Sequence, residues 1–141
     1  MAGERLGDER IQRYLATKHV VVLATLGPDG GPRGRAMWFL HTPDALFMLS
    51  VTETQKVPQL RRDPRVAVVA ESVTPEGVIR GMSLRGRAEF LDDSPQRRTL
   101  VETFLAKYHP RLEQYWGARS MPANRVMFRI APEHVTSWGL G

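Results

Sequence analysis

The sequence predicts a mainly β protein with helices (α+β), folded as a six-stranded antiparallel β-barrel over a single domain, residues 1–141. Three observations lead to this class. Short runs rich in β-branched residues alternate with Gly/Pro turns. The turns are short enough to join successive strands as antiparallel neighbours. Helical periodicity is confined to two principal segments, and a chain of this length buries one core.

The predicted strands are separated by strong turn signals. His19–Leu26 is a β-branched run that ends at the turn sequence GPDGG. In the next segment one face carries Arg33, Arg35, Met37 and Phe39, as a period of two requires, and both faces become large and apolar after Arg35. The six expected strands cover residues 19–26, 32–40, 46–51, 65–71, 81–91 and 125–130.

Capping residues mark the predicted helices. Asp8 caps a first helix, and Ser94-Pro95 opens a second, with serine at the N-cap and proline in the first turn. A short basic helix begins near Gln55 and is stopped by Asp63-Pro64. Residues 109–124 are predicted to be irregular. The apolar helix faces comprise Ile11, Tyr14 and Leu15 in the first helix, and Leu100, Val101, Phe104, Leu105 and Tyr108 in the second.

Composition excludes several classes of site. The chain has no cysteine, which rules out disulfides, thiolate metal ligands and a cysteine nucleophile. No serine lies in a nucleophile elbow. The four histidines lack the spacing of a metal site, so no metal is expected; they are His19, His41, His109 and His134.

Charge and hydropathy indicate the kind of partner. The net charge is +5, which favours an anionic partner such as a phosphate-bearing small molecule or nucleic acid. No apolar run resembles a signal peptide or is long enough to span a bilayer. We therefore expect a cytoplasmic protein with no membrane partner.

Lys56 stands at the mouth of the short basic helix. Thr52 and Thr54 are both able to cap this helix, and a helix N-terminus offers free amides to a phosphate. Lys56 would add a full positive charge to such a site. The alternative is that Lys56, with Arg61 and Arg62, forms a solvated basic face.

The segments "VVVLATLGPDGGPRGRAMWF", "LRRDPRVAVV" and "LRGRAEFL", in this order, resemble the split β-barrel family of pyridoxamine 5′-phosphate oxidase and the flavin/deazaflavin oxidoreductases. The resemblance covers roughly residues 9 to 138. It implies an FMN-binding split-barrel fold, a homodimer, and FMN or the deazaflavin coenzyme F420 bound at the subunit interface. Hydride transfer would be carried by the cofactor.

The resemblance also implies a set of cofactor-binding residues. Lys56 matches the family's lysine on the cofactor phosphate, preceded here by Gln55 where arginine is usual. Arg35 begins the segment that lies along the ring, where its charge would raise the reduction potential. The full set is Arg35, Met37, Trp38, Leu49, Ser50, Gln55, Lys56 and Gly81.

Departures from the oxidase pattern argue against pyridoxamine phosphate as substrate. Gly81 stands where the oxidase has a glutamine on the flavin, and Leu40 replaces its phosphate-binding lysine. The C-terminal Arg-x-His element has no counterpart. We therefore expect an oxidoreductase that acts on another small-molecule substrate, with its catalytic residues unassigned.

Two other classes remain open. One is a non-catalytic flavin or haem carrier on the same barrel. The other, favoured less, is a basic nucleic-acid-binding barrel in which Trp38 and Phe39 stack on bases. Of the three tryptophans, Trp138 is the best candidate for a dimer interface.

Overall fold

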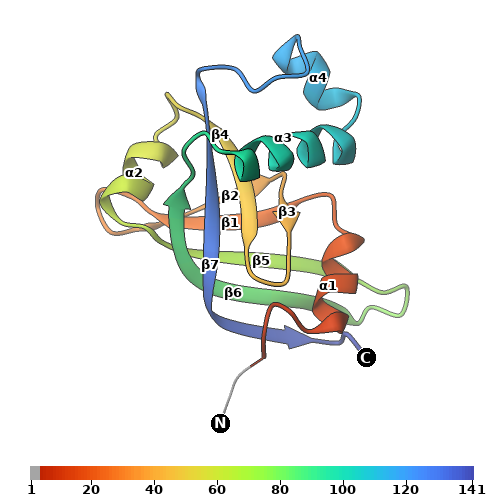
Figure 1. The fold of residues 1–141 in the computed structure, drawn as a ribbon. Helices are drawn as coiled ribbons and strands as arrows, with labels where there is room; N and C mark the ends of the chain where they lie inside the picture. The colour runs from red at the N-terminus through yellow and green to blue at the C-terminus, as the bar shows by residue number, and fades with distance from the viewer. Residues whose placement is uncertain (1–3) are drawn as a thin grey trace.

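The computed structural model describes residues 4–141 (Figure 1). Its elements confirm the mainly β class with helices. The helices are α1 (Glu9–Ala16), α2 (Lys56–Arg62), α3 (Pro95–Lys107) and α4 (Arg111–Trp116). The strands are β1 (Val21–Leu26), β2 (Pro32–Met37), β3 (Leu40–His41), β4 (Leu46–Val51), β5 (Arg65–Val73), β6 (Ile79–Phe90) and β7 (Arg125–Trp138).

All strands pair antiparallel in one curled sheet with the order β2-β1-β5-β6-β7-β4-β3. β2 and β3 form its two edges, yet only Trp38 and Phe39 separate them in the chain. The chain therefore crosses from one edge of the sheet to the other in two residues. The result is an open barrel whose seam is bridged at this one crossing.

This crossing corrects the predicted strand over residues 32–40. The structure divides it into β2 and β3, so the sheet has seven strands instead of six. The apolar alternation continues across the break because Met37 and Phe39 are both buried in the barrel interior. Periodicity alone could not show that the partner strand changes between them.

The last strand is also longer than predicted, because β7 continues from residue 130 to Trp138. Pro132 lies inside it, where its missing N–H would break a regular ladder. The structure places Pro132 opposite Gly86 at a bulge, where the pairing with β6 shifts register. A Cβ atom on Gly86 would lie 2.1 Å from the carbonyl oxygen of Ala131, so this close approach requires glycine.

Two apolar clusters flank the sheet. Ile11 and Leu15 of α1 are fully buried in the barrel interior, and Asp8 caps α1 as predicted. α3 covers the outer face of β3, β4 and β7, with Phe104 and Leu105 buried against them (Figure 1). Ser94 caps α3, accepting a hydrogen bond from the Arg97 amide.

The sequence predicted an irregular segment over residues 109–124, and the structure corrects this prediction in part. It contains α4, which ends at Gly117 in the left-handed region with φ of 72°. α4 lacks a capping side chain and buries only Leu112, which explains why its helical signal is weak. Within residues 4–141, no helix is long and apolar enough to cross a membrane.

Candidate functional site

A groove of about 540 Å³ lies beside the crossing between β2 and β3. Apolar side chains from five elements or their flanks form most of it: Met37, Trp38, Leu49, Phe104, Leu112 and Trp116. Its polar lining groups include Ser50, Thr54, Lys56 and Arg125. The groove is therefore mainly apolar, with two cationic side chains, Lys56 and Arg125, in its lining.

A second hollow, of about 80 Å³, adjoins the groove and has a polar lining. Arg33, Arg35 and Gln55 line it together with two buried polar residues, Thr25 and Gln59. Lys56 lines both cavities. No Asp or Glu belongs to either set of described lining residues; Arg33 pairs with Asp29 at 3.5 Å outside the hollow, whereas Arg35 and Lys56 form no salt bridge in the described chain.

Lys56, the first residue of α2, is half-buried between the two cavities. Its ammonium lies 3.7 Å from the Met37 sulfur, a weak acceptor, and no oxygen acceptor for it is found within residues 4–141. Burial lowers the pKa of Lys56, and the Arg35 charge lowers it further. A cation in these surroundings gains most from an anionic ligand.

The start of α2 differs from the predicted threonine cap. The N-cap residue is Gln55, whose side chain makes no capping bond. The Thr54 hydroxyl instead donates to the Val51 carbonyl at 2.9 Å and lies 3.1 Å from the hydroxyl of Ser50. The predicted threonine cap was wrong: the Thr54 side chain bonds back to the end of β4, and no hydrogen bond of the Thr52 side chain caps α2.

The structure brings most of the predicted site residues together. Met37, Trp38, Leu49 and Ser50 line the groove, and Lys56 joins it to the polar hollow. Arg35 and Gln55 line the hollow and not the groove, which places Arg35 beside Lys56.

Gly81 does not join this group. It lies on β6, where it pairs with Trp138 of β7. A Cβ atom on Gly81 would lie 2.4 Å from the Ala70 carbonyl oxygen and 2.7 Å from the Trp138 ring, so its surroundings within the chain are already filled.

Several lining residues were not predicted from the sequence, and four of them show why. Trp116 comes from α4, the helix that the sequence left irregular, and Arg125 begins β7 opposite Val51. Gln59 lies four positions after Gln55, hence on the same face of α2, and Thr25 lies two positions after the inward-facing Leu23. A search for polar residues at buried positions would have found the last two.

Known proteins resemble this chain both in sequence and in fold. The sequence matches the family described as pyridoxamine 5′-phosphate oxidase over residues 8–139. The chain belongs to the pyridoxamine 5′-phosphate oxidase family. Because members of this family form split barrels, the predicted fold class is confirmed, with seven strands in place of six. No curated protein gives a significant sequence match.

Solved structures share the fold of this family member. The conserved hypothetical protein Rv2991 from Mycobacterium tuberculosis is 26% identical, with a TM-score of 0.79 over 94% of this chain and 84% of its own. An F420 reductase is 25% identical, with a TM-score of 0.60 over 83% and 88%. The haem storage protein HutZ from Vibrio cholerae is 17% identical, with a TM-score of 0.75 over 94% of each chain, and shows likeness of fold alone.

Proposed function

We propose that this protein is an oxidoreductase that binds FMN or coenzyme F420 in the apolar groove and acts on a small-molecule substrate. One observation carries the proposal. The half-buried ammonium of Lys56 stands where an apolar groove meets an arginine-lined hollow, and it has no oxygen acceptor within the described chain. A planar apolar ring joined to a phosphate matches both parts of this site.

In this proposal each cavity holds one part of the cofactor. The polar hollow holds the phosphate, with Lys56, Arg35 and Gln55 as its ligands. Met37, Trp38 and Leu49 contact the ring, and the Ser50 hydroxyl faces the chain between ring and phosphate. When bound, a flavin or deazaflavin supplies hydride transfer, while these residues position it and exclude water.

This arrangement changes the role proposed for Arg35. The sequence suggested that Arg35 lies along the ring and raises the reduction potential. Its position in the hollow beside Lys56 instead supports a phosphate contact. A guanidinium is suited to this role because its fork of N–H groups matches phosphate oxygens.

The relatives support this class of cofactor. The match to the pyridoxamine 5′-phosphate oxidase family and the likeness to an F420 reductase both favour redox chemistry. The likeness to HutZ keeps a haem carrier as the alternative. Against it, neither His nor Cys is among the described residues that line the groove, which leaves only Met37 and Tyr115 as candidate axial ligands for a haem there.

We further propose a homodimer of split-barrel domains, one to each chain. Strand β2 is an edge strand, and Gly34 and Ala36 are exposed on it. Val22, 42% exposed, pairs with Ala36 and with Val69, which makes a flat patch of small and apolar residues. Burying this patch against a second copy would cover the open side of the sheet. Trp138, which is partly buried over Gly81, remains the other candidate for this contact.

The test is the visible spectrum of the purified protein, followed by titration with FMN and with F420. We expect tight binding of one of them and a dimer in sedimentation. A haem spectrum, or no binding of either cofactor to the dimer, would overturn the proposal. Steep salt-dependent binding of nucleic acid without a coloured ligand would favour the nucleic-acid alternative.

A further inference from the structure

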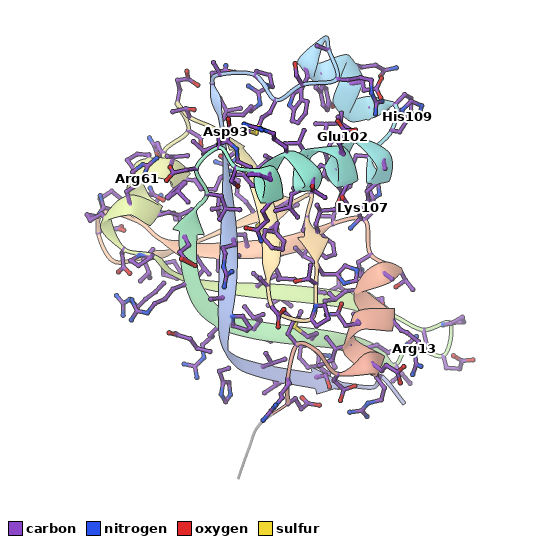
Figure 2. All side chains as sticks on the ribbon, viewed as in Figure 1. Arg13, Arg61, Asp93, Glu102, Lys107 and His109 are labelled. Carbon is purple, nitrogen blue, oxygen red and sulfur yellow. The ribbon has the colours of Figure 1, made fainter. Side chains whose placement is uncertain are left out.

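A separate cavity of about 350 Å³ opens beside the groove. Trp38 and Tyr115 line both spaces, so these two side chains form a common wall. The remaining wall includes His19, Tyr108 and Arg111. Figure 2 labels His109 at the junction of α3 and α4, on the rim of this cavity. Its volume lies in the range of small-molecule sites.

The inner wall is a cluster of aromatic rings. Trp38 and Tyr108 stack with ring centroids 4.3 Å apart and an interplanar angle of 7°. The His19 ring meets Tyr108 edge-on at 4.9 Å. Tyr115 lies 6.0 Å from Trp38 and is 65% exposed, so a large part of its ring is free to contact a ligand. Such surfaces favour a flat aromatic guest, which gains stacking as well as burial.

The polar end of Tyr108 is turned away from this cavity. Its hydroxyl accepts from the Phe39 amide at 2.8 Å and lies within donor reach of the Phe39 and His19 carbonyls, at 2.9 and 3.0 Å. Burial raises the pKa of Tyr108 to about 12, so the phenol stays neutral. The wall therefore presents the apolar face of the ring and carries no negative charge that would repel an anion.

Arg111 supplies a positive charge at the rim. It lies four positions before Tyr115, hence on the same face of α4. Glu113 is engaged by His109, at 3.1 Å, and by Arg119. Arg111 itself makes no salt bridge with any carboxylate in residues 4–141. Its guanidinium is thus the charge left available to a ligand.

We propose that this cavity binds a planar aromatic carboxylate, with the ring on Trp38 and Tyr115 and the carboxylate on Arg111. If the groove holds the redox cofactor proposed above, this is the substrate subsite, because Trp38 separates the two spaces by a single side chain. The binding itself does not require the cofactor. Aromatic surface and one unpaired guanidinium together favour benzoate-like compounds over neutral or aliphatic ones.

The test uses benzoate, benzamide and cyclohexanecarboxylate with the full-length protein, followed by ¹⁵N NMR. We expect benzoate to bind more tightly than the other two and to shift the signals of His19, Arg111 and Tyr115. Arg111→Gln should weaken benzoate binding about tenfold, the lower end of the effect for a charge-assisted hydrogen bond, and change benzamide binding less than about twofold. Arg98→Gln, on the exposed side of α3 and paired with Asp93, is the matched control and should change neither.

Three results would overturn this subsite. The first is equal affinity for benzoate and cyclohexanecarboxylate. The second is benzoate binding that is unchanged by Arg111→Gln, and the third is benzoate binding that shifts the Lys56 signal instead of those of His19, Arg111 and Tyr115. FMN and F420 titrations separate this proposal from the proposed function, since Arg111 lies outside the groove and its variant should bind them normally. Arg111-dependent benzoate binding without any cofactor binding would leave the subsite standing and refute the oxidoreductase.

Discussion

Replacing Lys56 with methionine is expected to have opposite effects on cofactor affinity and on fold stability. The ammonium makes no hydrogen bond to oxygen in the described chain, and its closest partner is the Met37 sulfur at 3.7 Å. A cofactor phosphate would give it a charge-assisted hydrogen bond, of about 1.5–3 kcal/mol. Lys56→Met should therefore weaken binding of FMN or F420 about 10- to 150-fold.

The stability of the free protein should not fall in the same variant. Methionine keeps the unbranched apolar stem against Met37 and removes the ammonium. Burial and the Arg35 charge both disfavour this ammonium in the folded protein, as the lowered pKa of Lys56 indicates. We expect an equal or higher melting temperature without cofactor, and a smaller increase on adding cofactor. Raising the salt concentration should weaken cofactor binding less in the variant than in the parent protein.

Calorimetric titration and thermal unfolding measure the two effects separately. Arg62→Met is the matched control, because Arg62 is exposed at the other end of α2 and lines neither cavity. It should leave both quantities nearly unchanged. Cofactor affinity within about twofold of the parent value in Lys56→Met would refute the reasoning and return Lys56 to a solvated face.

Three other predictions concern the same region. Burial lowers the pKa of Lys107 to about 8, so the unfolded chain binds more protons above that pH, and the free energy of unfolding should rise from pH 8 toward 10. Above pH 10 the free energy of unfolding should fall again, because Tyr108 has a folded pKa of about 12 and the folded chain then binds more protons than the unfolded chain. Urea titrations of the parent protein and of Lys107→Met would measure both trends. Tyr108→Phe leaves the Phe39 amide without its acceptor and should cost about 1–3 kcal/mol in chemical denaturation, whereas an unchanged midpoint would show that water replaces the hydroxyl. Arg35→Gln should weaken cofactor binding and leave the midpoint potential of the bound cofactor unchanged; a redox titration showing a lower potential at equal affinity would place Arg35 at the ring after all.

Local signals in the sequence were sufficient for most elements. Asp8 and Ser94 were identified as helix caps because their side chains bond to amides two or three positions away, within the range of a local motif. Lys56 also begins a helix as expected, although the threonine cap on which that expectation rested does not form. These features depend on near neighbours in the chain, and the structure reproduces them.

The features that could not be predicted depend on distant partners. The change from β2 to β3 is invisible in the alternation of Met37 and Phe39, since both remain buried. The continuation of β7 through Pro132 depends on Gly86, far away in the sequence. The walls of the groove likewise combine α4 with β2, and no local pattern shows that Trp116 and Trp38 line the same space.

The two-residue crossing between the sheet edges links the width of the groove to the position of α3. Both polar backbone atoms of Phe39 are held by α3, since Tyr108 bonds to its amide and carbonyl and Lys107 donates to the same carbonyl at 2.8 Å. Figure 2 shows Lys107 below the C-terminal end of α3, facing the strands. A displacement of the Trp38 backbone, next to Phe39 at the wall of the groove, would strain these hydrogen bonds. Entry and release of a bound molecule would then depend on how often the end of α3 separates from Phe39. Hydrogen exchange of the Phe39 amide would report the frequency of this opening.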